Sequence, residues 1–295
     1  FGLLAGLGLQ NKYSMAVWGL SLVVGLALSP GRRALARPWI WLGGLLAGLV
    51  FLPNVLWNVA HGWPFLEFLR GVRESGRDVE LAPLEYVAHQ VLNANPAGLP
   101  IWLAGLGWLL LSARGRAFRP LGTAFLVALA VFVLTKGKDY YLAPAFATLF
   151  AAGGVALEGA TAVGWKRWLR PALVLLYVLT LPFLPFGLPL LAPDRLIAYQ
   201  ERIGFTPPAT EKAHARAVLP HHFAWQIGWD ERVAAVALVY HAMPPEEQAR
   251  VAIVANNYGD AGAIDLLGPR YGLPVKAVGT HQSYWLWGPG EPGKD

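Results

Sequence analysis

The sequence contains no cysteine and little charge, since Asp, Glu, Lys and Arg make up only 14% of its 295 residues. The lack of cysteine excludes disulfides and thiolate metal sites. The low charge, together with 55% hydrophobic residues, places the chain among membrane proteins rather than soluble ones. The net charge of +6 comes from Lys and Arg in short links between apolar stretches, not from one basic face. We therefore predict no nucleic-acid partner.

Long apolar stretches fill the first two-thirds of the chain. A helix that crosses a bilayer needs roughly 17 to 25 apolar residues, and shorter runs are tolerated inside a bundle. The candidate spans are residues 1–10, 15–29, 38–60, 97–112, 121–135, 140–157 and 169–192. We expect residues 1–193 to form a polytopic α-helical membrane region with about six to seven spans. The region begins in mid-span without a basic leader, so we expect it to be N-terminally incomplete.

The charges of the links alternate along the chain. Residues 30–38, 112–120 and 158–170 are rich in Lys or Arg, whereas residues 61–85 carry more acidic than basic side chains. Because basic residues accumulate on the cytoplasmic side, the three basic links are predicted inside. Residues 61–85, the turn at 136–139 and everything after residue 193 are then predicted outside.

After residue 193 the sequence changes character, and charged residues become frequent and mixed in sign. Periodicity predicts helices at residues 230–243 and 261–267 and strands at 251–255 and 275–278. We expect residues 194–295 to form a small soluble α/β domain.

In the first outer link, residues 84–92 have the spacing of an amphipathic helix. Its predicted polar face carries Glu85, His89 and Gln90. The helix is expected either to lie on the membrane surface or to pack on protein.

A turn of ionisable and aromatic residues lies between two predicted spans. Ionisable groups at the edge of a membrane are functional candidates, because burying them is costly. Ammonium groups and phenols in this arrangement are suited to a lipid-linked phosphate, and an interfacial anchor is the alternative. The candidate phosphate-binding residues, including two from the end of the first span, are Lys12, Tyr13, Lys136, Lys138, Asp139, Tyr140 and Tyr141.

A second group of amides and aromatic rings ends the span at 38–60. Such groups bind the apolar faces and hydroxyl edges of sugars, and an aromatic belt at the membrane surface is the alternative. The candidates for a sugar or acceptor cavity are Asn54, Trp57, Asn58, His61 and Trp63. The histidines of the tail lack the spacing of a ligand set, so no metal site is predicted.

With these segments identified, the chain resembles glycosyltransferase family 39. This family includes bacterial relatives of the dolichyl-phosphate-mannose protein mannosyltransferases and the lipid A aminoarabinose transferase. The resemblance depends on residues 6–13, 53–58, 61–63 and 136–145, and in the tail on residues 256–263 and 283–288. It implies a GT-C-like helical bundle, partial in this chain, with its active cavity on the outer face of the bacterial inner membrane.

The resemblance also implies the chemistry. The donor would be a sugar linked to a polyprenyl phosphate, and the acceptor a lipid, a glycan or a protein. The catalytic carboxylate is expected in a first outer loop upstream of Phe1, so no catalytic residue is assigned. No cofactor is predicted, and a divalent cation is left open. The alternative is a non-catalytic membrane anchor or transporter-like protein that displays a soluble binding domain.

Overall fold

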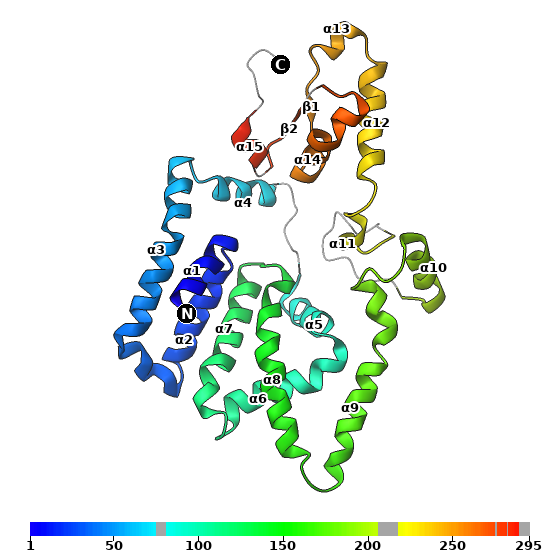
Figure 1. Cartoon of the computed structure of the whole chain (residues 1–295). Coiled ribbons are helices and arrows are strands. Elements are labelled where there is room, and N and C mark those ends of the chain that lie inside the picture. Colours follow the sequence, from blue (N-terminus) through cyan, green and yellow to red (C-terminus); the bar gives the residue numbers. More distant parts are fainter. Residues whose placement is uncertain (75–80, 206–217, 275, 282, 289–295) are drawn as a thin grey trace. The chain divides into compact units, whose positions relative to one another are not determined.

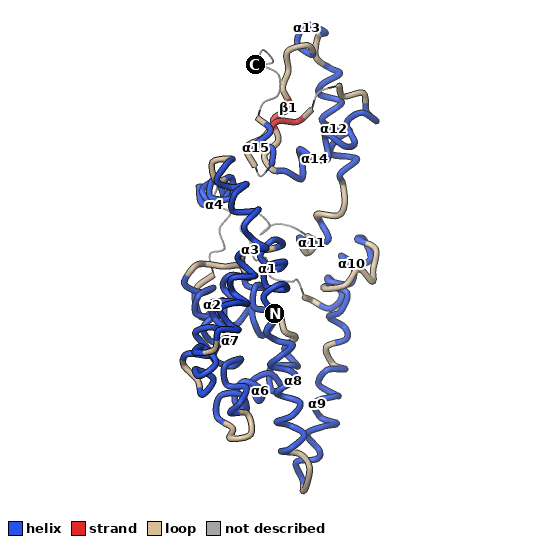
Figure 2. The backbone as a smooth tube through the Cα atoms, turned by 60° about the vertical axis from the view of Figure 1, so that its left-hand side comes forward, coloured by secondary structure: helices blue, strands red, loops and turns tan. Residues whose placement is uncertain are grey.

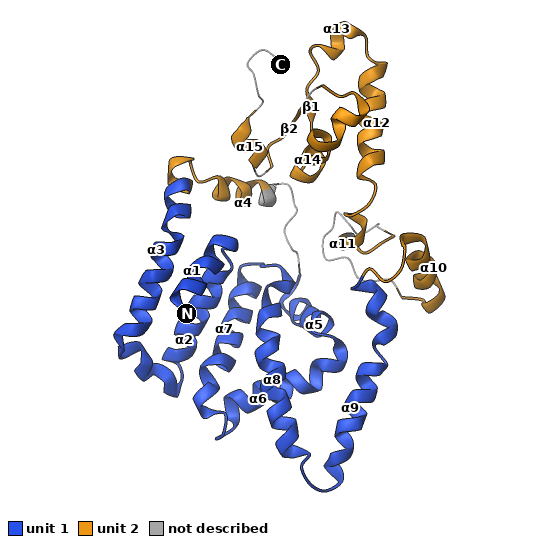
Figure 3. Cartoon of the chain, viewed as in Figure 1, with its two compact units in different colours: residues 1–57, 79–188 blue, residues 58–78, 189–295 orange. Residues whose placement is uncertain are grey.

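The computed structural model describes the chain outside residues 75–80, 206–217, 275, 282 and 289–295. The described chain divides into two compact units, shown in different colours in Figure 3. Unit 1 comprises residues 1–57 and 79–188, and unit 2 comprises residues 58–78 and 189–295. Unit 2 thus contains the predicted tail together with residues 58–78, most of which belong to the first predicted outer link. Part of that link, at residues 75–80, lies outside the described residues.

Unit 1 is entirely helical in its described part (Figure 1). Its α-helices are α1 (Gly2–Asn11), α2 (Met15–Ala27), α3 (Pro38–Ala60), α5 (Pro83–Asn93), α6 (Leu99–Leu111), α7 (Arg119–Leu134), α8 (Ala143–Ala160) and α9 (Leu169–Val178). Short 3-10 helices join or extend them: η1 (Pro30–Ala36), η2 (Pro96–Gly98), η3 (Arg116–Phe118), η4 (Asp139–Leu142), η5 (Trp165–Trp168) and η6 (Leu181–Phe186).

Among the described residues, three helices are long and apolar enough to cross a membrane: Pro38–Ala60, Arg116–Leu134 and Asp139–Ala160. Two further pairs, α2 with η1 and α5 with α6, reach the required length together but bend by 111° and 93°. The polytopic helical class is therefore confirmed, with three to five candidate spans by length and composition among the described residues, and the number of six to seven spans stays a prediction. The predicted span at 169–192 is not one helix, because α9 ends at Val178 and prolines interrupt the segment that follows.

The core of unit 1 lies between α5, α6, α7 and α8. Its buried side chains are Tyr86, Trp102, Leu109, Phe125, Ala128, Phe132, Leu142, Phe146, Leu149 and Ala152. Helices α6 and α8 approach closely at Gly105 and Gly153, where a Cβ atom on either glycine would collide with a backbone carbonyl of the other helix. Small residues allow this approach inside a membrane, where apolar side chains gain little by leaving lipid.

Unit 2 is also mainly helical and contains the two strands of the described chain (Figure 2). Its helices are α4 (Pro64–Glu74), α10 (Pro193–Ile203), α11 (His221–Ala224), α12 (Trp229–Ala242), α13 (Pro245–Gln248), α14 (Tyr258–Leu267), η8 (Gly268–Tyr271) and α15 (Ser283–Trp287). Strands β1 (Ile253–Val254) and β2 (Ala277–Val278) pair in parallel. The predicted tail helices are confirmed and the strands are shorter than expected, while Val275, the first residue of the second predicted strand, lies outside the described residues.

A polar contact fixes the strand pair to the helices around it. The Asp265 carboxylate on α14 accepts hydrogen bonds from the backbone N–H of Ala277 and from the Tyr284 hydroxyl, both at 2.7 Å. Burial, followed by the bond to Asp265 and its negative charge, raises the pKa of Tyr284 to about 12. One carboxylate therefore ties β2 and α15 to α14.

Candidate functional site

The predicted turn begins where α7 ends. Lys136 adopts a left-handed backbone conformation with φ of 52°, and the N–H of Gly137 donates to the carbonyl of Phe132 at 2.8 Å. The N–H of Lys136 donates to the carbonyl of Val133 at 3.3 Å. These two bonds form a Schellman end, in which the left-handed position is usually glycine. A lysine there is strained, so the turn is held by its surroundings.

Asp139 lies at the start of η4, and its side chain points into the protein. The residue is 6% exposed. Its carboxylate lies 3.0 Å from Nδ1 of His89 and accepts a bond from Nδ2 of Asn93 at 3.1 Å. The backbone N–H of Tyr140 donates to the other carboxylate oxygen at 3.0 Å. Three donors around one buried carboxylate offset the cost of removing the charge from water.

Helix α5 also bonds to the backbone of the turn. The Tyr86 hydroxyl donates to the carbonyl of Lys138 at 3.1 Å, and Nε2 of Gln90 donates to the carbonyl of Asp139 at 3.0 Å. Tyr86 and Gln90 are each 2% exposed. Of the predicted polar face, His89 and Gln90 therefore face the protein, whereas Glu85 is exposed, as are apolar residues such as Leu84. Sequence reasoning missed this partnership, although polar residues at 86, 89, 90 and 93 share one helical face.

Lys12 approaches the turn from the end of α1. Its Nζ atom lies 5.0 Å from the ring centroid of Tyr140 and 4.6 Å from that of Tyr141. The two tyrosine rings contact each other edge to face at 5.1 Å. The structure thus brings together three of the predicted phosphate-binding residues from segments far apart in the sequence. Lys12 and Tyr140 are exposed, so an anion has access to both.

Tyr13 joins the two groups of predicted residues. Its hydroxyl donates to Oδ1 of Asn54 on α3 at 2.9 Å, and its ring contacts Phe51 edge to face at 5.8 Å. From the sequence, Tyr13 was predicted to bind phosphate and Asn54 to line a sugar or acceptor cavity. Their hydrogen bond places the start of the second group beside Lys12.

The remaining predicted residues are distributed between the units. Trp57 belongs to unit 1, and Asn58, His61 and Trp63 belong to unit 2. Asn58 is buried, whereas His61 and Trp63 are exposed. A common sugar cavity of all five residues therefore stays a prediction.

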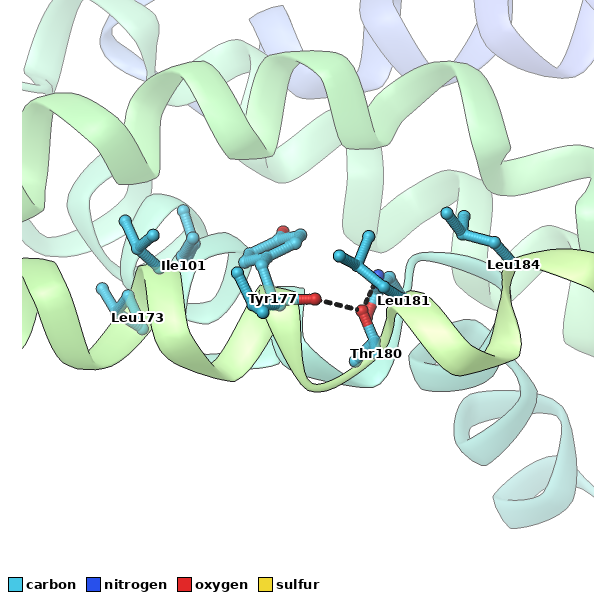
Figure 4. Close-up of a pocket in the computed structure, with 9 residues that line it drawn as sticks. Ile101, Leu173, Tyr177, Thr180, Leu181 and Leu184 are labelled. Carbon is cyan, nitrogen blue, oxygen red and sulfur yellow. Dashed lines mark hydrogen bonds between the residues drawn. The ribbon is translucent and has the colours of Figure 1, made fainter. Parts of the chain in front are cut away.

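An apolar groove of about 400 Å³ lies between α6 and the segment that contains α9 and η6 (Figure 4). Its walls include Ile101, Leu173 and Leu184. At one end, Nδ2 of Asn95 donates to Oγ1 of Thr180 at 3.1 Å. A groove of this composition fits a hydrocarbon chain better than a polar ligand.

Within the described parts of the chain, no three His, Cys, Asp or Glu side chains are placed to hold a metal ion. Cations near the turn come from lysine instead. The site is thus a cationic and phenolic surface beside apolar helices.

These features are those of a polytopic helical membrane protein with a cationic site at the end of its candidate spans. Residues 1–57 match the family model of the dolichyl-phosphate-mannose-protein mannosyltransferases. The family resemblance is therefore confirmed over this segment, which contains Lys12, Tyr13, Asn54 and Trp57. No curated protein and no solved structure matches the chain.

The match identifies the chain as similar to membrane glycosyltransferases. It covers α1, α2 and most of α3, so it includes both partners of the bond between Tyr13 and Asn54. The turn at 136–141 lies outside the matched segment and contacts it through Lys12.

Proposed function

We propose that this chain forms the donor-binding part of a membrane glycosyltransferase that takes its sugar from a polyprenyl phosphate. The observation that supports this most directly is the contact of Lys12 with Tyr140 and Tyr141. It joins the segment that matches the mannosyltransferase family to the turn that the sequence predicts as a phosphate site.

The strengths of the interactions available to Lys12 favour a phosphate ligand. A cation over an exposed aromatic ring contributes about 0.5–1 kcal/mol. A hydrogen bond to a charged group contributes about 1.5–3 kcal/mol. An arriving phosphate would therefore draw the ammonium group of Lys12 away from the rings, whose hydroxyls donate to the same anion.

This arrangement suits the departure of the carrier. A polyprenyl phosphate is a stable leaving anion, so neutralising its charge matters more than protonating it. Lys12, with the lysines of the turn, supplies that positive charge. A general base on the acceptor hydroxyl or amine would complete an inverting transfer, and we assign no residue of this chain to that role.

The apolar groove between α6 and α9 supports a lipid-linked donor. Its apolar side chains would bury the apolar surface of an isoprenoid chain. The acceptor, whether lipid, glycan or protein, then reaches the sugar from the aqueous side of the bilayer.

Unit 2 bears on the sidedness of the reaction. The rings of Phe68 on α4 and His281 in the tail stack at 5.4 Å with 11° between their planes. Two segments in contact lie on the same side of any membrane that the chain spans. With the basic links on the cytoplasmic side, as the sequence predicts, that face would be extracytoplasmic in the bacterial inner membrane. The tail would then be an outer domain of the enzyme.

Replacement of Lys12 tests the function. In the protein expressed from its intact gene, we expect Lys12→Gln to lower transfer by about a hundredfold, the order of loss when a charge-stabilising group is removed. The readout is mass spectrometry of the glycolipids and glycoproteins of cells that carry each variant. Lys166→Gln, in a link predicted on the cytoplasmic side, is the matched control and should leave the products unchanged. Unchanged products with Lys12→Gln at normal membrane abundance would contradict the proposal.

A further inference from the structure

Four polar residues of α5 face the turn, of which Tyr86 and Gln90 are buried, His89 is half-buried and Asn93 is exposed. Tyr86, His89, Gln90 and Asn93 follow a three-to-four-residue spacing along one side of the helix. Each makes a hydrogen bond to Lys138 or Asp139. Three apolar residues of the helix, Leu84 at 81% exposure, Val87 and Leu92, are exposed. A row of polar side chains bonded in this way specifies the position of the turn relative to α5.

The orientation of the Asp139 carboxylate matters for phosphate binding at the turn. It is adjacent in sequence to Lys138 and Tyr140, so a freely rotating carboxylate would pair with a nearby ammonium group and repel an incoming phosphate. His89 and Asn93 instead hold the same carboxylate oxygen, Oδ2, while the N–H of Tyr140 holds Oδ1. The side-chain exposures of His89 and Asp139 are 13% and 8%, so water competes little for the bond between them.

We propose that His89, assisted by Asn93, is a positioning residue that keeps the Asp139 carboxylate turned toward α5 and away from the phosphate-binding side of the turn. The inference rests on the proposed function, because it assigns a role to α5 in the same donor site. His89 acts through Asp139 and does not itself contact the phosphate. The bond survives in the neutral imidazole when Nδ1 carries the proton, and a protonated imidazole also neutralises the carboxylate.

The test compares phosphate binding among variants of the full-length protein. Farnesyl phosphate is the probe, and farnesol, which lacks the phosphate, reports on the hydrocarbon chain alone. His89→Leu should weaken farnesyl phosphate binding by about tenfold, as loss of a group behind a binding site typically does, and leave farnesol binding unchanged. His89→Asn keeps an N–H donor near the position of Nδ1, so its affinity should stay closer to wild type. Val87→Leu, on the exposed side of α5, is the control for added volume.

A double variant separates positioning from mere support of the fold. In His89→Leu with Asp139→Asn, the misplaced negative charge is removed, and farnesyl phosphate binding should recover. Failure of this recovery would overturn the proposed role of the carboxylate. Wild-type binding in His89→Leu together with weak binding in Lys12→Gln would overturn the inference and leave the proposed function standing. Wild-type binding in both single variants would overturn the two together.

Discussion

Lys136 occupies a backbone conformation that costs a non-glycine residue about 1–2 kcal/mol. We expect Lys136→Gly to raise the free energy of unfolding by about 1 kcal/mol, because glycine adopts this conformation without a Cβ clash. Thermal unfolding in detergent measures the change. A lower melting temperature would show that the lysine side chain stabilises the turn by more than its backbone strain.

The same variant examines function at that residue. If Lys136 neutralises the donor phosphate, Lys136→Gly should bind farnesyl phosphate more weakly even though the protein is more stable. Equal affinity in the two proteins would assign Lys136 to anchoring at the membrane surface, the alternative that its sequence also allows.

Tyr284 gives a prediction that depends on pH. Its folded pKa of about 12 lies above the ordinary value of 10.0, so the contribution of its hydroxyl to stability is complete below pH 10 and is lost as the pH rises through about 12. The difference in tyrosinate absorbance between wild type and Tyr284→Phe should therefore titrate near pH 12 in the folded protein. A midpoint near 10 would mean that the bond to Asp265 is absent.

The sequence identified the residues of the turn but not the α5 residues that form hydrogen bonds with them. Two lysines, an aspartate and two tyrosines between apolar spans are visible in the sequence, and so is the neighbouring Lys12. That His89 would hold Asp139 was not predictable, because the two are 50 residues apart and no periodicity reports which helix covers a turn. The same limit explains why Asp139 was grouped with the phosphate-binding residues although its carboxylate faces α5.

At the scale of elements, the packing of α6 on α8 makes a prediction about glycine. Gly105→Ala places a Cβ against the carbonyl of Leu149, and we expect it to destabilise the protein by about 1–3 kcal/mol. Gly107→Ala, two residues further along α6, meets no atom within 4 Å and is the matched control. Thermal stability in detergent compares the two. Equal melting temperatures would show that α6 and α8 are not in this close contact.

Hydropathy located the long helices and failed where the chain bends. Residues 38–60 were predicted as a span and form α3, because one apolar run of that length has few alternatives. Residues 169–192 are as apolar, but Pro182 and Pro185 remove backbone donors and leave a 3-10 segment after α9. The 93° bend between α5 and α6 likewise depends on Asn95, whose φ of 63° and side-chain bonds were not readable from apolar periodicity.

At the scale of the whole molecule, the absence of cysteine allows a clean topology test. Single cysteines at Ala252 in unit 2 and Ala113 in a basic link, both exposed, should react differently with a maleimide that does not cross membranes. In intact cells we expect label on Ala252→Cys alone, and on Ala113→Cys after permeabilisation. Label on Ala113→Cys but not on Ala252→Cys in intact cells would reverse the proposed orientation.

Helix α3 passes from one compact unit into the other without a break. Asn54, bonded to Tyr13, and Asn58, the first residue of unit 2, are four residues apart on it, or about 6 Å along its axis. The bond from Tyr13 therefore ties α1 to α3 about one helical turn before the residue at which the chain leaves unit 1.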